Sequence, residues 1–136
     1  MRDDQTNRTM PRIVVSESDH DRLTDLATAA LDRLPETAQE LLDEMERAEV
    51  VGAPAVPANV VGMGSTVTFQ PDGGRKRRVT LVFPAAADIA ESRISVLTPI
   101  GTALIGLSEG QSIDWSARDG RRHQLTVLAV ERPPAP

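Results

Sequence analysis

Apolar residues recur at helical spacing in two stretches of the first third of the chain. The spacings are three or four residues throughout, at Leu23, Ala27, Ala30 and Leu34 and then at Ala38, Leu41, Met45 and Ala48. Such spacing gives each helix one apolar seam, as in a coiled coil. Leu34-Pro35 interrupts the pattern, because proline disfavours a continuous helix. The sequence therefore predicts a short antiparallel helical hairpin within residues 13–50.

Capping residues precede both predicted helices. Ser16 or Ser18 can cap the first helix, and Thr37-Ala38-Gln39-Glu40 resembles a capping box for the second. A short β-prone run at residues 13–15 comes before them. Each helix spans about 14 residues, so the hairpin projects roughly 20 Å at 1.5 Å per residue. The two seams satisfy each other, which predicts a monomer.

Beyond the hairpin the pattern changes from a helical to a strand-like period. Residues 51–59 contain two prolines and predict a fairly stiff linker. Residues 60–132 then form a second domain, with β-rich segments bounded by turn residues. The predicted strands are residues 66–69, 77–83, 93–97, 111–115 and 123–130, with turns at 71–74 and 117–120. Together with the hairpin they predict an α+β fold with an antiparallel sheet and one short helix.

The short helix lies in the segment that runs from Ile94 to Trp115, ISVLTPIGTALIGLSEGQSIDW. Thr98 suits the N-cap of this helix and Pro99 its first position, where the missing N–H is not needed. Gly106 and Gly110 close the helix and turn the chain into the next strand. The segment therefore predicts a strand, a capped helix and a second strand in immediate succession.

Composition and charge limit the functions open to the chain. A net charge of −5 argues against autonomous or sequence-specific binding to DNA, and favours a basic surface on a partner protein. Only three aromatic residues are present, too few for a base-stacking platform. The absence of cysteine excludes disulfides and thiolate metal sites. No apolar run reaches membrane length, which predicts a cytoplasmic protein without a membrane partner. Residues 1–12 and 133–136 are expected to be tails.

Titratable residues show no pattern that is typical of catalysis. Asp32, Glu36 and Glu40 gather near the hairpin turn, but the second helix carries acids along a whole face, as a solvated helix does. His20 and His123 lack the spacing of metal ligands, and nucleophile-elbow and phosphate-loop motifs are absent. The sequence predicts no catalytic residue, no metal, no cofactor and no enzyme activity.

The Thr98-Pro99 segment resembles a signature of the Gre transcript-cleavage factors. That signature is Ser-Pro, an aliphatic residue, two free positions, Ala-Leu, another aliphatic residue and, after four more positions, Gly-Asp. Asn59-Val60-Val61 and Gly64-Ser65-Thr66-Val67 also resemble the entry to the first strand of the Gre C-terminal domain. The short hairpin makes the chain more similar still to the regulator of nucleoside diphosphate kinase (Rnk) family. The resemblance runs from Ile13 to about Val130.

This resemblance implies a transcription regulator that binds bacterial RNA polymerase. Its FKBP-like sheet domain would dock at the rim of the secondary channel, and the hairpin would point inward and compete with Gre factors. The residues expected at the docking contact are Leu97, Thr98 and Pro99, with Leu97 standing where Gre proteins often carry Asp or Asn. Asp32 and Glu36 are candidate contacts of the hairpin tip, and Arg75, Lys76 and Arg77 form a candidate basic patch.

Two other functions stay open at this point. A Gre-like factor would use Asp32 and Glu36 to promote cleavage of backtracked RNA, although the hairpin is shorter than in Gre factors and lacks their acidic tip motif. Alternatively, the chain regulates a nucleoside diphosphate kinase by direct contact, as the family name suggests. A prolyl isomerase is disfavoured, because three aromatic residues cannot build the pocket that FKBP-type isomerases use.

Overall fold

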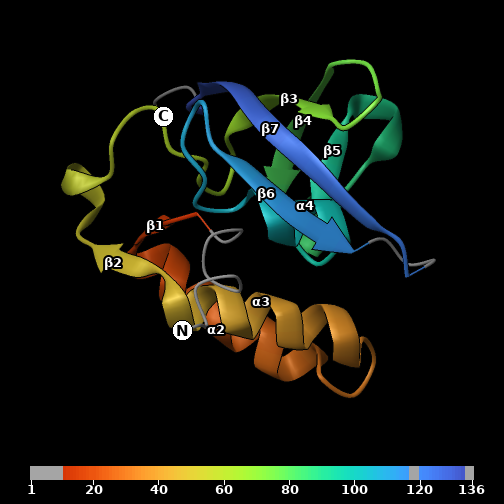
Figure 1. Cartoon of the computed structure of the whole chain (residues 1–136). Helices are drawn as coiled ribbons and strands as arrows, with labels where there is room; N and C mark the ends of the chain where they lie inside the picture. Colours follow the sequence, from red (N-terminus) through yellow and green to blue (C-terminus); the bar gives the residue numbers. More distant parts are fainter. Residues whose placement is uncertain (1–10, 117–119, 134–136) are drawn as a thin grey trace, which may run out of the picture.

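The computed structural model describes residues 11–116 and 120–133, and it places a helical hairpin against a five-stranded sheet domain (Figure 1). The predicted tails therefore lie largely outside the described residues, as do positions 117–119 of the predicted turn. The hairpin consists of α2 (Glu17–Ala30) and α3 (Pro35–Arg47). No helix in the described ranges is long and apolar enough to cross a membrane.

The two helices pack through the apolar seam that their spacing predicts. Six seam residues are buried between them, namely Leu23, Ala27, Ala30, Ala38, Leu41 and Met45. Ser16 caps α2, because its hydroxyl accepts a hydrogen bond from the Asp19 N–H at 3.1 Å. The capping box predicted for the second helix is wrong. Helix α3 begins at Pro35 after the N-cap residue Leu34, without a side-chain cap, because proline already suits the first helical position.

The base of the hairpin is closed by a pair of short parallel strands, of which only the first was anticipated, as the β-prone run at residues 13–15. Strand β1 (Val14–Ser16) pairs with β2 (Glu49–Val51), with Val15 opposite Val50. The Val14 N–H also donates to the carbonyl of Gly106 at 3.1 Å. The start of the segment predicted as a linker is thus strand, and a 3₁₀ turn, η1 (Ala53–Ala55), follows it.

The sheet contains the five predicted strands in the order β5-β4-β3-β7-β6. Their bounds are β3 (Thr66–Pro71), β4 (Arg77–Val82), β5 (Arg93–Ser95), β6 (Ser112–Ser116) and β7 (Arg122–Glu131). The prediction of a wholly antiparallel sheet is wrong at one edge, where β4 and β5 are parallel. Two 3₁₀ turns, η2 (Pro84–Ala86) and η3 (Ile89–Glu91), carry the chain back so that β5 runs parallel to the second half of β4, with Arg93 opposite Thr80.

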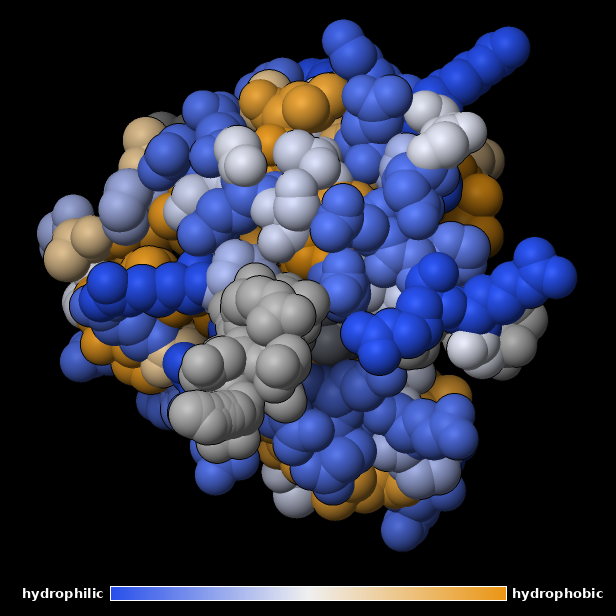
Figure 2. All heavy atoms as spheres, in the orientation of Figure 1, coloured by the Kyte–Doolittle hydropathy of each residue, from blue (hydrophilic) through white to orange (hydrophobic). Residues whose placement is uncertain are grey.

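A single apolar core joins the hairpin to the sheet. It includes seam residues such as Leu23 and Leu41, sheet residues such as Phe69 and Val127, and Leu104 of the short helix α4 (Pro99–Leu104). Figure 1 shows α4 on the side of the sheet that faces the hairpin. On the face shown in Figure 2, hydrophilic residues dominate and apolar residues emerge only in separate patches.

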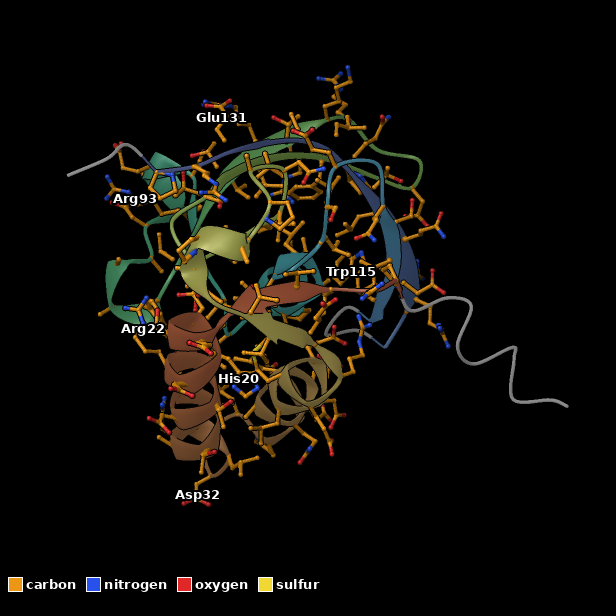
Figure 3. The ribbon with its side chains drawn as sticks, turned by 90° about the vertical axis from the view of Figure 1, so that its left-hand side faces the viewer. His20, Arg22, Asp32, Arg93, Trp115 and Glu131 are labelled. Atoms are coloured by element: carbon orange, nitrogen blue, oxygen red, sulfur yellow. The ribbon has the colours of Figure 1, made fainter. Side chains whose placement is uncertain are left out.

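Two polar contacts tie α2 to the sheet domain. Asp19 accepts a hydrogen bond from the Met63 N–H at 3.2 Å, and it pairs with Arg22 at 3.0 Å. The Arg22 guanidinium in turn lies 4.6 Å from the centre of the Phe83 ring, a cation–π distance. Figure 3 shows Arg22 at the end of α2 nearest the sheet domain, with Asp32 at the far end of the hairpin. These contacts fix the direction in which the hairpin points.

We predict that Gly101→Ala destabilises the fold by about 3 kcal/mol, because overpacking at a rigid site is costly. A Cβ atom at this position would lie 2.2 Å from the carbonyl oxygen of Ser95 and 2.8 Å from the Cα of Val96. Gly52→Ala is the matched control, since its Cβ would have 3.9 Å to its nearest neighbour. Urea unfolding measures both, and equal stability of the two variants would contradict the packing described here.

Candidate functional site

The element predicted to dock is a rigid turn between β5 and α4. The Thr98 hydroxyl accepts from the Gly101 N–H at 3.0 Å and donates to the Ser95 carbonyl at 2.8 Å. Thr98 is thus the N-cap of α4, as predicted, and Pro99 occupies the first helical position. The buried Thr102 hydroxyl adds a bond of 2.8 Å to the Val96 carbonyl. These bonds hold α4 in place although it is only six residues long.

The three predicted docking residues differ in exposure. Leu97 is 6% exposed and belongs to the core, whereas Thr98 and Pro99 are half-buried at the surface. The structure therefore revises the role expected of Leu97, because its side chain has little surface to offer a partner. Burial of Leu97 instead anchors the turn from which Thr98 and Pro99 are presented.

Beside this turn lies a surface groove, here called the α4 groove, with a volume of about 370 Å³. Its floor and walls are mostly apolar, and the only charged residues that line it in the described part of the chain are two arginines. The lining residues are Arg77, Ala87, Ile89, Arg93, Ile94, Ser95, Thr98, Pro99, Ile100 and Trp115. The predicted docking pair thus shares one surface with Arg77 of the predicted basic patch. The sequence analysis missed Ile89 and Arg93, which the crossover between β4 and β5 brings to the groove.

The predicted basic patch is divided by the point at which β4 begins. Arg75 and Lys76 are exposed in the turn before the strand and do not line the groove. Arg77 shares the inner face of the sheet with Phe69, and its guanidinium lies 5.7 Å from the centre of that ring. Arg78 pairs with Glu131 at 3.0 Å. Alternation along β4 sends Arg77 and Arg78 to opposite faces of the sheet, whereas Arg75 and Lys76 lie before the strand, so only Arg77 of the patch reaches the groove.

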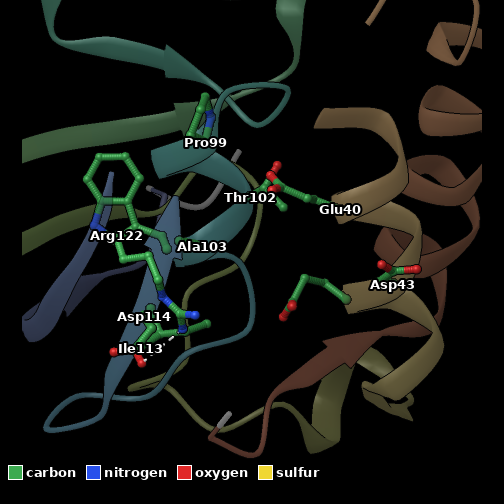
Figure 4. Close-up of a pocket in the computed structure, with 10 residues that line it drawn as sticks. Glu40, Asp43, Pro99, Thr102, Ala103, Ile113, Asp114 and Arg122 are labelled. Atoms are coloured by element: carbon green, nitrogen blue, oxygen red, sulfur yellow. Dashed lines mark ion pairs between the residues drawn. The ribbon is translucent and has the colours of Figure 1, made fainter. Parts of the chain in front are cut away.

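A second cavity, of about 220 Å³, separates α3 from α4 and β6 (Figure 4). It shares Pro99 and Trp115 with the α4 groove, but three carboxylates of α3 line its other side, namely Glu40, Asp43 and Glu44. Asp114 and Arg122 also line it and lie 3.6 Å apart. Burial at the cavity edge raises the pKa of Glu40, and the carboxylates of Glu36, Glu44 and Asp43 raise that pKa further.

The acidic residues at the hairpin tip do not converge on a point. Asp32 and Glu36 are both exposed, and Figure 3 shows Asp32 at the end of α2 away from the sheet. Among the described residues, no group of three or more His, Cys, Asp and Glu side chains is placed to hold a metal ion. Metal-assisted cleavage needs carboxylates that converge on one ion, so this geometry does not favour it.

The two histidines have structural surroundings. His20 Nε2 lies 3.1 Å from the carbonyl oxygen of Met45, which connects the two helices of the hairpin. His123 packs against Trp115 with ring centres 5.1 Å apart, and its Nδ1 lies 3.6 Å from Asp72. Trp115 is half-buried at the boundary between the α4 groove and the second cavity.

Charge is unevenly distributed between the two parts of the molecule. Residues 13–51 contain eleven acidic and three basic side chains, a net charge of −8. Residues 60–132 contain seven acidic and nine basic side chains, a net charge of +2. The hairpin is therefore suited to a basic surface, whereas the α4 groove is bordered by positive charge.

Two family models match the chain in the order of its two parts. Residues 11–51 match the Rnk N-terminus, and residues 56–132 match the C-terminal domain of the transcription elongation factors GreA/GreB. The fold and site thus define a helical hairpin joined to a Gre-type sheet domain. The chain belongs to the regulator of nucleoside diphosphate kinase (Rnk) family, which is related to the Gre factors.

Individual relatives agree with this assignment. A regulator of nucleoside diphosphate kinase from Escherichia coli is 36% identical over 126 residues, which are 91% of this chain and 92% of that protein. The transcription elongation factor GreA of Brucella canis is 33% identical over 93 residues, which are 68% of this chain and 59% of GreA. A solved structure of a prokaryotic transcription elongation factor GreA/GreB from Nitrosomonas europaea has a TM-score of 0.71 and 33% identity, covering 88% of this chain and 99% of that one. The predicted resemblance and fold class are confirmed.

We predict that Thr98→Ala lowers the free energy of unfolding by about 1 kcal/mol, the usual cost of losing an N-cap hydroxyl. Thr98→Ser keeps the hydroxyl that bonds Gly101 and Ser95, so it should stay close to the parent chain. Urea unfolding of the two variants measures the difference. An equal loss in both would show that the methyl group, and not the cap, is what matters.

A pH-dependent effect is expected at Glu40. Because its pKa is raised in the folded state, the folded chain binds a proton that the unfolded chain has released. Stability therefore falls as pH rises from the usual glutamate pKa through the raised one. Glu40→Gln should be the more stable chain at pH 7, by less than about 1 kcal/mol for a partly exposed charge. This advantage should disappear below the usual glutamate pKa.

Thermal unfolding between pH 3 and pH 8 tests this expectation. Glu46→Gln is the matched control, an exposed position on the same helix that does not line the second cavity. A Glu40→Gln advantage that persisted unchanged in acid would rule out the charge of Glu40 as its cause.

Proposed function

We propose that this chain binds RNA polymerase at the rim of the secondary channel and regulates transcription without performing chemistry. The observation that carries this proposal is the position of the Thr98-Pro99 turn on an apolar groove bordered by Arg77 and Arg93. Shape and residue chemistry are those of a protein-binding surface, with an apolar centre and a charged rim. The similarity of the sheet domain to proteins named as transcription elongation factors supports polymerase as the partner.

The hairpin is assigned a blocking role in this proposal. Its helices of 14 and 13 residues give a projection of roughly 20 Å. Its net negative charge would favour entry into a channel with basic walls. Asp32 and Glu36 do not converge on a metal-sized point, so the hairpin would occupy the channel mouth and compete with Gre factors without promoting RNA cleavage.

A second candidate function is direct binding to a nucleoside diphosphate kinase. It is favoured by one observation, the name of the Escherichia coli relative. The match to that relative covers 91% of this chain. The same surfaces would serve such a partner. A test of which of the two proteins the purified chain binds therefore distinguishes the two candidate functions.

The proposal predicts micromolar or tighter binding of the full chain to core RNA polymerase, and displacement by GreA. Truncation of the groove edge by Pro99→Ala with Ile100→Ala should weaken binding about tenfold, a loss typical of a central interface residue. Neither change removes the Thr98 cap. Leu128→Ala is the matched control, because Leu128 is 39% exposed on β7 and does not line the groove.

Four results would contradict the proposal in different ways. No binding to polymerase at micromolar concentration rejects it, and capture of the kinase alone favours the second candidate. If the groove variant and the control variant weaken binding equally, the groove is not part of the interface. Cleavage of RNA in stalled elongation complexes, dependent on Asp32 and Glu36, would assign the chain to the Gre-like function.

A further inference from the structure

The α4 groove has a one-sided charge character that restricts what it can bind. Its apolar surface comes mainly from Ile89, Ile94, Ile100 and Trp115. Among the described residues, Arg77 and Arg93 are the only charged ones that line it, and none of its described lining residues is acidic. No hairpin residue lines the groove either, so the acidic helices of the same chain leave it open.

The two arginines are positioned by the fold and have no acidic partner in the part of the chain that the structure describes. Arg77 leaves β4 and lies over the ring of the buried Phe69. The backbone of Arg93 is fixed at the start of β5 by two hydrogen bonds of 2.9 Å with the backbone of Asp88. Neither guanidinium forms an ion pair with any residue in the described ranges. A guanidinium without such an ion pair can bind a carboxylate of a partner through two parallel hydrogen bonds.

An apolar side chain projects beside these charges. Ile89 is 88% exposed, which is unusual for an isoleucine that also borders a groove. It lies on η3, where the Asp88 side chain accepts a hydrogen bond from the Ala90 N–H at 3.1 Å. Ser92 ends this turn in the left-handed conformation, with φ of 58°. Ile89 is thus presented by a fixed turn, ready to pack against a partner.

We infer that the occupant of the α4 groove is a segment of the polymerase that exposes a large apolar side chain flanked by carboxylates. The inference rests on the proposed function and adds the chemistry of the partner. The apolar side chain would pack on Ile89, Ile94 and Trp115, while Arg77 and Arg93 bind the carboxylates. Close to an apolar floor, such pairs are screened less than on an open surface. Arg77 and Arg93 would then determine which segment is recognised.

Binding to core RNA polymerase across a salt series tests the role of the arginines. Arg77→Ala with Arg93→Ala should weaken binding about tenfold or more and reduce its dependence on salt. Arg75→Ala with Lys76→Ala removes the same charge from an exposed turn outside the groove, and it should change affinity less than twofold. Urea unfolding must show that both pairs of substitutions leave the fold intact.

The chemistry of the occupant is tested by a photo-cross-linking amino acid placed at position 89 of the full chain. Mass spectrometry of the cross-linked polymerase should identify a segment with an apolar residue and Asp or Glu within four positions. A basic or uncharged segment would overturn the inference, as would cross-links to a second copy of this chain or to nucleic acid.

Failure of the inference is distinguishable from failure of the proposed function. If the parent chain binds polymerase and both pairs of arginine substitutions behave alike, the inference is wrong and polymerase binding stands. If the parent chain does not bind polymerase at all, the proposed function fails and the inference falls with it.

Discussion

The close packing of α4 against the end of β5 is the constraint on which the rest of the structure depends. Gly101 lies so near the backbone of Ser95 that no side chain fits there. This contact lets a six-residue helix turn back at once onto the sheet, with Leu104 in the core. Because Pro99 lines both the α4 groove and the second cavity, the position of α4 shapes both surfaces. A shift of α4 would therefore alter the sheet domain, the groove and its border with the hairpin together.

The hairpin is attached to the sheet domain by more than its connecting chain. The β1–β2 pair bonds to the turn at Gly106, Asp19 accepts a hydrogen bond from Met63, and Arg22 lies over Phe83. Core packing continues across the same boundary. The direction of the hairpin is thus set by several independent contacts, and its negative charge is carried at a fixed position relative to the positive rim of the groove. A partner that contacts both parts must match this arrangement of charge.

The two cavities beside α4 show how one helix can separate opposite chemistries. On one side, Arg77 and Arg93 border an apolar groove that no acidic residue within 11–116 or 120–133 lines. On the other, Glu40, Asp43 and Glu44 line a cavity between the two parts of the molecule, and the pKa of Glu40 is raised there. Pro99 and Trp115 form the boundary. A neutral groove would accept many apolar segments, whereas two arginines at its border would favour segments that carry carboxylates.

The sequence by itself determined the two hairpin helices, the five strands of the sheet and the caps of α2 and α4. The spacing of Leu23, Ala27 and Ala30 gives a seam that only a helix can bury, and Thr98 caps α4 through atoms a few residues away. Only the tertiary structure decided which residues share a surface. The parallel β4–β5 pair brings Arg93 and Ile89 beside Arg77, and the burial of Leu97 depends on core residues far along the chain. Such placements follow from long-range pairing and packing, which residue spacing along the chain does not encode.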